Sequence, residues 1–161
     1  MNNLIIFNAQ YLYLLAIALL AIYFFLLPKD KKKSIVILSA VYFPLTYLLA
    51  KIASFLYFDP RPFVVGHFTP LISHAPDNGF PSDHMLLVSA IASILFVYNK
   101  KLGAVAWIVA FIIGASRVLA GIHHWTDILG SAVIAVGVMW LVKDYIMKTN
   151  IINKFFKKSS K

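Results

Sequence analysis

The segment from residue 116 to residue 127 reads Ser-Arg-Val-Leu-Ala-Gly-Ile-His-His-Trp-Thr-Asp, and it separates two long apolar segments. It places Arg117, two adjacent histidines and Asp127 in one short connection. An isolated charge at the centre of a bilayer costs about 3 kcal/mol or more. Charges this dense beside apolar segments therefore indicate either a solvated loop or a functional site at a membrane surface, and the rest of the chain decides between them.

The chain is too apolar for a soluble domain of its length. Of its 161 residues, 61% are hydrophobic and 13% are charged, and the mean hydropathy is +0.81. This composition predicts an integral membrane protein. The absence of cysteine excludes a disulfide framework, a thiolate metal site and a cysteine nucleophile.

Apolar segments separated by turn signals predict an all-α bundle of about five transmembrane helices. Pro60 and Pro62 stop the second apolar segment, because each disfavours helical geometry at the residue before it. The stretch Pro81-Ser82-Asp83-His84 has the composition of a helix start and follows a loop expected over residues 63–80. The five expected spans are residues 10–27, 34–58, 81–98, 102–115 and 125–142.

The lysines predict the orientation of this bundle. Basic residues occur in an expected turn at 29–33, at 100–101 and from 143 onward, and five spans bring all three segments to one side. The positive-inside rule makes that side the cytoplasm, so both arginines and all five histidines belong to the outer face. We therefore attribute the net charge of +9 to orientation of the protein in the membrane and not to nucleic-acid binding. We expect a transmembrane domain over residues 1–149 and a basic amphipathic cytoplasmic tail over 150–161.

Clusters at the outer face carry groups suited to phosphoryl transfer. Arg61 and Arg117 offer forks of donors that match phosphate oxygens, and the start of the third span offers free backbone N–H groups. His123 and Asp127 are four residues apart, so on a helical turn the carboxylate can hold one imidazole nitrogen and leave the other free to attack. His84 is then a candidate to protonate the leaving oxygen.

The same clusters resemble a known family. Pro-Ser-Asp-His at 81–84 and Ser-Arg, five residues, His, three residues, Asp at 116–127 resemble the second and third motifs of the type-2 phosphatidic acid phosphatase superfamily. Arg61-Pro62 resembles the end of the first motif. Within the superfamily, the stretch 57–63 and Asp83 are most similar to bacitracin-resistance-type undecaprenyl-diphosphatases. The resemblance implies a compact helical membrane enzyme with its active site at the outer membrane–water interface and without a metal or other cofactor.

By position, the resemblance implies His123 as nucleophile, Asp127 as its orienting partner and His84 as general acid. The residues implied to bind the substrate phosphate are Arg61, Arg117, Ser82, Asp83, Ser116 and Lys51.

Two of these residues depart from the family pattern. Asp83 stands where the family usually has glycine, which puts a carboxylate near an anionic substrate. Lys51 lies nine residues before Arg61 instead of six, and Ser54 takes the usual place of the lysine. Three residues amount to about 4.5 Å along a helix, a distance that a lysine side chain can span.

The expected function is hydrolysis of undecaprenyl diphosphate to undecaprenyl phosphate and inorganic phosphate through a phosphohistidine intermediate, in the cell membrane. Two alternatives stay open. One is a phosphatase of another lipid: phosphatidylglycerophosphate, phosphatidate or a lipid A phosphate. The other is a non-enzyme, either a small transporter or an inactive relative that binds lipid phosphate. The expected partners are a lipid phosphate and the bilayer, and the sequence does not set the oligomeric state.

The remaining histidines allow a metal alternative. His124 beside His123 could form a zinc-like set with His84 and Asp127, although two nearby arginines would repel a cation. We otherwise expect His124 to be an interface residue, and His67 and His74 to be loop histidines.

Overall fold

We describe the protein from a computed structural model, in which residues 1–148 form helices joined by loops. The helices are α1 (Asn2–Tyr11), α2 (Tyr13–Leu26), α3 (Lys29–Leu56), α4 (Pro62–Val65), α5 (Asp83–Tyr98), α6 (Lys100–Leu119) and α7 (Trp125–Lys148). The predicted all-helical membrane bundle is confirmed. Residues 149–161 lie outside the described residues, and so does the basic tail expected over 150–161, which stays a prediction.

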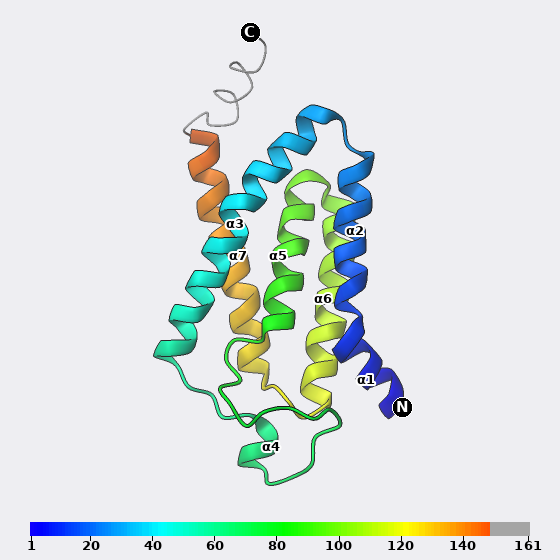
Figure 1. Ribbon diagram of the computed structural model, residues 1–161, viewed down its shortest axis with the longest axis vertical. Helices are drawn as coiled ribbons and strands as arrows, with labels where there is room; N and C mark the ends of the chain where they lie inside the picture. Colours follow the sequence, from blue (N-terminus) through cyan, green and yellow to red (C-terminus); the bar gives the residue numbers. More distant parts are fainter. Residues whose placement is uncertain (149–161) are drawn as a thin grey trace.

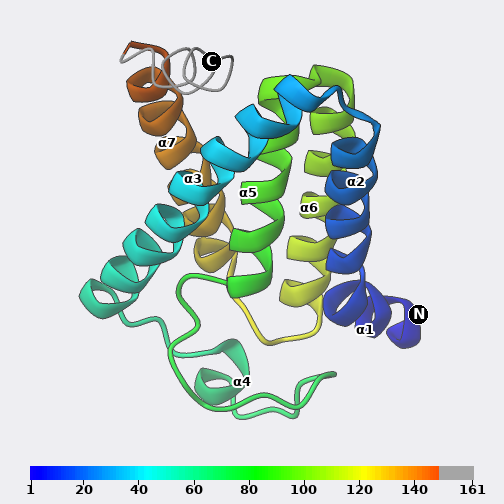
Figure 2. The ribbon, with the colours of Figure 1, turned by 45° about the horizontal axis from the view of Figure 1, so that its top comes forward.

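Helix α5 lies inside the bundle, with α2, α3, α6 and α7 packed against it (Figures 1 and 2). Nearly all of its residues from Met85 to Leu95 are buried. A helix that is apolar around its whole circumference is stable where other helices cover it. The sequence of α5 therefore specifies a central position.

Helix α5 is also too short to cross a bilayer. Its 16 residues extend for about 24 Å, whereas the hydrocarbon core is about 30 Å thick. Helices α3, α6 and α7 are long and apolar enough to cross, and α1 with α2 forms a fourth candidate span that is bent by 44°. The five expected spans thus correspond to four candidate crossings among the described residues (α1 with α2, α3, α6 and α7) and to the shorter central helix α5. In Figure 1 the loop that joins α3 to α5 lies beneath the Asp83 end of α5.

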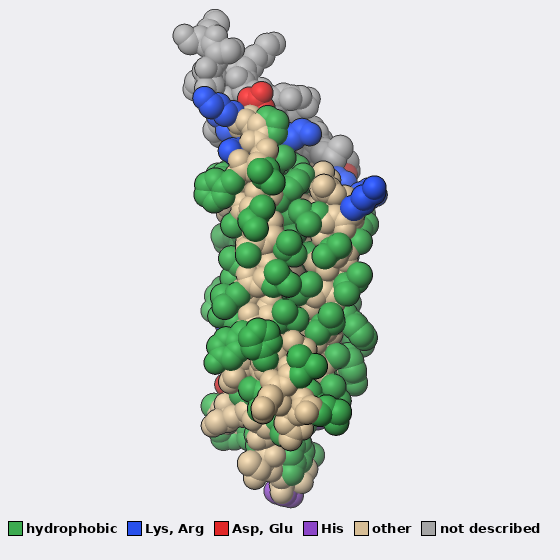
Figure 3. Space-filling model, turned by 90° about the vertical axis from the view of Figure 1, so that its right-hand side faces the viewer, with side chains coloured by type: hydrophobic (Ala, Val, Ile, Leu, Met, Phe, Trp, Pro, Cys, Tyr) green, Lys and Arg blue, Asp and Glu red, His purple; other side chains and the backbone are tan. Residues whose placement is uncertain are grey.

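The two ends of the bundle differ in charge. Figure 3 shows lysine and arginine side chains gathered at one end, an apolar middle and a histidine at the opposite end. The starts of α3 and α6 and the end of α7 lie at the basic end (Figure 1). Residues 29–33, expected as a turn, form the first turns of α3 instead, because lysine is a good helix former.

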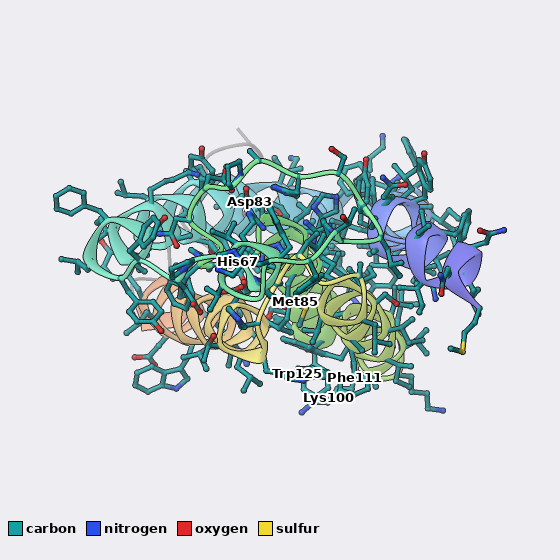
Figure 4. All side chains as sticks on the ribbon, turned by 90° about the horizontal axis from the view of Figure 1, so that it is seen from below. His67, Asp83, Met85, Lys100, Phe111 and Trp125 are labelled. Atoms are coloured by element: carbon teal, nitrogen blue, oxygen red, sulfur yellow. The ribbon has the colours of Figure 1, made fainter. Side chains whose placement is uncertain are left out.

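The α3–α5 loop is held in place by the side chain of Asn78. Its Nδ2 donates to the carbonyls of Ser54 (2.9 Å) and Tyr57 (3.0 Å), at the end of α3. Its Oδ1 accepts from the backbone N–H groups of Asp59 (2.9 Å) and Phe80 (3.0 Å). The loop, which contains the short helix α4, therefore has a defined path across this end of the bundle, as the view from below shows (Figure 4).

Replacement of Asn78 by alanine should destabilise the loop, because backbone donors and acceptors lose their partner together. We expect Asn78→Ala to lower the free energy of unfolding by about 1–3 kcal/mol, measured as thermal unfolding in detergent. Ser73→Ala, at an exposed position of the same loop, is the matched control and should leave the melting temperature unchanged. Equal melting temperatures for the two variants would contradict the role of Asn78.

Candidate active site

The centre of the site is a buried pair formed by His123 and Asp127. His123 lies in the turn between α6 and α7, and Asp127 lies in the first turn of α7. His123 is 2% exposed and Asp127 is 0% exposed. His123 Nδ1 lies 3.0 Å from Asp127 Oδ2, which also accepts from the backbone N–H of His124 at 2.9 Å. Because an ionised carboxylate only accepts hydrogen bonds, His123 carries a proton on Nδ1.

The other nitrogen of His123 faces two guanidinium groups. Its Nε2 lies 3.2 Å from Arg117 Nη2 and 3.3 Å from Arg61 Nη1. Guanidinium nitrogens only donate, so Nε2 is the acceptor and keeps its lone pair. Arg61 is fixed further by donation to Asp77 Oδ1 (2.6 Å) and to the Ile122 carbonyl (2.8 Å). The arrangement presents an unprotonated imidazole nitrogen beside two guanidinium groups, a combination suited to phosphoryl transfer.

Burial lowers the pKa of the His123 imidazole below its ordinary value of 6.5. The positive charges of Arg117 and Arg61 act in the same direction, and Asp127 opposes them. The imidazole is therefore neutral at neutral pH, the state in which Nε2 can attack phosphorus.

A cavity of about 300 Å³ opens in front of His123. Six of the residues singled out in the sequence line it: Lys51, Arg61, Asp83, His84, Arg117 and His123. Asp127 lies behind His123 and does not line the cavity. Ser82 and Ser116 are buried but do not line it either, and no hydrogen-bond partner for Ser82 Oγ is found among the described residues. The structure thus brings most of the expected set together and leaves two serine hydroxyls outside it.

Lys51 reaches the cavity despite its shifted position in the sequence. Its ammonium lies 5.1 Å from the centre of the Tyr47 ring, a cation–π contact. Ser54, at the usual position of the family's lysine, also lines the cavity. Ser54 Oγ accepts a hydrogen bond from Asn78 Nδ2 at 3.1 Å, so this serine helps to hold the α3–α5 loop.

The α3–α5 loop contributes residues that the sequence did not single out as phosphate ligands. Asp77 pairs with Arg61, and His74 lies with its ring centre 6.4 Å from that of His123. His74 and Asp77 both line the cavity, whereas His67, the other loop histidine, is exposed. The pair Asn78-Gly79 is a turn signal, and it is the local feature of the sequence that marks this segment. A Cβ on Gly79 would lie 2.9 Å from Asp127 Oδ2, so only glycine lets the loop approach the pair this closely.

His124 points away from the cavity-lining set and toward Asp59. Its Nδ1 lies 3.2 Å from Asp59 Oδ1, while Thr126 donates to Asp59 Oδ2 at 2.8 Å. Ligand-type atoms of Asp59, His124 and Asp127 lie within 4.8 Å of one another, and within the described chain this is the group with metal-ligand spacing. The metal alternative expected from the sequence combined His124 with His123, His84 and Asp127. In the described residues, the group with metal-ligand spacing contains Asp59 in place of His123 and His84. Pairing of an imidazole with a carboxylate is sufficient to explain this proximity.

Comparison with known proteins identifies related sequences. The model of the PAP2 superfamily matches residues 35–151. Bacitracin transport permease protein BcrC of Bacillus licheniformis is 33% identical over 138 residues, which cover 84% of this chain and 67% of that protein. Undecaprenyl-diphosphatase BcrC of Bacillus subtilis (strain 168) is 33% identical over 141 residues, covering 84% of this chain and 70% of that protein.

A solved structure shares the fold. The crystal structure of Aquifex aeolicus LpxE superimposes with a TM-score of 0.68 at 24% identity, covering 88% of this chain and 86% of that chain.

The geometry around His123 predicts its tautomer and titration. In NMR spectra of the protein labelled at histidine nitrogens, with His123→Gln to assign the signal, Nδ1 should carry the proton and the pKa should lie below 6.5. Asp127→Asn should lower this pKa further, because the carboxylate is the charge that favours the imidazolium. A His123 pKa above the ordinary value, or a proton on Nε2, would contradict the assignment.

Proposed function

Because the chain belongs to the PAP2 superfamily and is a membrane lipid phosphatase, we propose that its substrate is undecaprenyl diphosphate. The products are undecaprenyl phosphate and inorganic phosphate, and the reaction passes through a phosphohistidine at His123. The observation that carries this proposal is the free Nε2 of His123 between two guanidinium groups, at 3.2 and 3.3 Å.

The first step forms a bond between His123 Nε2 and the terminal phosphorus and breaks the bond from phosphorus to the bridging oxygen. His84, which lines the same cavity, donates a proton to the departing lipid phosphate. Burial and the positive charge of Arg117 lower the pKa of its imidazole to about 4, so the anionic head group has to bind beside it to favour the protonated form. Arg61 and Arg117 stabilise the charge on the transferring phosphoryl oxygens. Asp127 stabilises the positive charge that the imidazole gains, through the proton on Nδ1.

The second step releases phosphate. Water attacks the phosphorus and the bond to Nε2 breaks, which returns His123 to its neutral state. His84, deprotonated in the first step, accepts a proton from that water. Both steps use groups that already face the cavity.

An apolar groove beside the cavity supports a lipid substrate. The groove has a volume of about 290 Å³ and lies between α3 and α5. Lys51 and Asp83 line both the groove and the cavity, so the two spaces adjoin there. A diphosphate head group in the cavity can therefore have its first prenyl units in the groove. The residues that line the groove are Phe43, Thr46, Tyr47, Lys51, Asp83, Leu86, Leu87 and Ala90.

Hydrolysis by the purified protein tests the substrate and the nucleophile together. The protein should release phosphate from undecaprenyl diphosphate faster than from phosphatidate or phosphatidylglycerophosphate. His123→Gln should lower the rate by at least about 10³-fold, and alkaline quenching should trap phosphohistidine in the parent protein. His124→Gln is the matched control at the adjacent position and should keep most of the activity.

The same assay separates the alternatives. Preference for a glycerolipid would move the substrate to that class and leave the mechanism in place. Undiminished hydrolysis by His123→Gln would eliminate the phosphohistidine. A chelator should leave the rate unchanged, and loss of activity that zinc restores would establish the metal alternative.

We further propose that the active site faces outward and that the C-terminus is cytoplasmic. The starts of α3 and α6, which carry lysines, lie at the end of the bundle opposite to the α3–α5 loop that borders the site (Figures 1 and 3). The chain contains no cysteine, so single cysteines report on sidedness. A membrane-impermeant maleimide added to intact cells should label Ser73→Cys, in the exposed α3–α5 loop, and should not label Lys101→Cys at the start of α6. The reverse pattern would place the site in the cytoplasm.

A further inference from the structure

The break between α1 and α2 lies beside the active site, although it is outside the part of the chain that matches the family model, residues 35–151. The two helices meet at Leu12 with a bend of 44°. There is no proline or glycine at the break. Sharp bends in helices otherwise arise where a side chain inserts into the ladder of backbone hydrogen bonds.

Arg117 is the side chain that inserts. Its Nη1 donates to the carbonyl of Ala9 at 2.9 Å. In an uninterrupted helix that carbonyl would accept from the backbone N–H of Tyr13, a bond that is not among the backbone hydrogen bonds of the described residues. The same guanidinium places Nη2 3.2 Å from His123 Nε2. The break therefore supplies the carbonyl that sets the direction of a phosphate-binding group.

The first residue of α2 contacts a second active-site group. The rings of Tyr13 and His84 have their centres 5.0 Å apart at an interplanar angle of 88°, an edge-to-face contact. No hydrogen bond from a protein group to the His84 ring is found among the described residues. The Tyr13 ring therefore packs edge-to-face against this imidazole, where it can limit rotation of the ring.

The segment is fixed to the rest of the site. Ala9 is fully buried in an apolar cluster with Ile72 of the α3–α5 loop and with Ala120 and Ile122 of the turn that carries His123. Ile122 also accepts from Arg61 through its carbonyl. A shift of α1 would therefore be transmitted to Arg117 and to the turn.

We propose that Ala9 and Tyr13, on either side of the break between α1 and α2, position the active site: the Ala9 carbonyl holds Arg117 and the Tyr13 ring orients His84. Neither residue lines the cavity, so both act through the groups they contact. The inference rests on the proposed phosphatase mechanism, in which His84 protonates the leaving oxygen. Misplacement of a catalytic group by about 1 Å can cost about 100-fold in rate.

Substrates with different leaving groups test the Tyr13 contact. Octyl phosphate releases a strongly basic alkoxide and needs a proton from His84, whereas p-nitrophenyl phosphate releases a weakly basic phenoxide and needs it much less. Tyr13→Leu should lower kcat on octyl phosphate by about 10- to 100-fold with KM little changed. Its effect on p-nitrophenyl phosphate should be several-fold smaller. Tyr13→Phe keeps the ring and should restore the parent rates, and Tyr11→Leu, at an exposed position two residues earlier, is the matched control.

Inorganic phosphate as a competitive inhibitor tests the Ala9 contact. Ala9→Leu overpacks α1 against the site, and Ala16→Leu overpacks α2 at an equally buried position away from it. Both should lower thermal stability, but only Ala9→Leu should weaken inhibition, by about tenfold.

Equal losses of rate on both esters in Tyr13→Leu, or equal inhibition constants in the two alanine variants, would overturn the positioning role. Because these esters contain no prenyl group, the outcome is separate from the choice of natural substrate. A parent protein that hydrolyses both esters but not undecaprenyl diphosphate would overturn the substrate assignment, while the Tyr13 comparison would still decide the inference.

Discussion

The site depends on the opposition of charges across one imidazole ring. Asp127 holds Nδ1 of His123 on one edge, and two guanidiniums face Nε2 on the other. Buried guanidiniums are costly unless each finds partners, and here the partners come from distant parts of the chain. Asp77 and the Ile122 carbonyl serve Arg61, and the Ala9 carbonyl serves Arg117. Arg117 Nε has no hydrogen-bond partner among the described residues.

The short central helix provides the space for this arrangement. If α5 extended as far as its neighbours, its first turn would occupy the volume in which the α3–α5 loop and the cavity lie. Because it begins at Asp83, His84 faces the cavity, and the loop can bring Asp77 against Arg61 beneath the helix. Glycine at position 79 permits the last part of this closure, since any side chain there would collide with Asp127. The short length of α5 and the path of the α3–α5 loop therefore depend on each other.

The sequence predicted what depends on short spacing and on composition. The apolar segments predicted the helical membrane bundle, and the four-residue interval from His123 to Asp127 predicted a contact that the structure contains at 3.0 Å. It could not predict pairings across long separations in an irregular loop, such as Arg61 with Asp77, because no period or propensity specifies them. The Ala9–Arg117 contact joins residues 108 positions apart and uses a backbone carbonyl, which every residue has. Ser82 was expected at the phosphate, yet its side chain is buried without a partner among the described residues, since a motif sets position in the chain and not the rotamer.

In the proposed reaction, the charges of the cavity walls bear on turnover as well as on binding. Lys51, Arg61 and Arg117 are opposed by Asp77 and Asp83 along the same walls. A cavity with the three cations alone would bind inorganic phosphate and the substrate alike, and uniform binding of this kind does not raise kcat. Asp77 engages Arg61 directly, at 2.6 Å, so an incoming phosphate has to compete for that guanidinium. Asp83 places a negative charge where the cavity meets the apolar groove. In the proposed reaction, the carboxylates therefore weaken the hold on the phosphate product, while the guanidiniums that face His123 Nε2 stay directed at the transferring phosphoryl group.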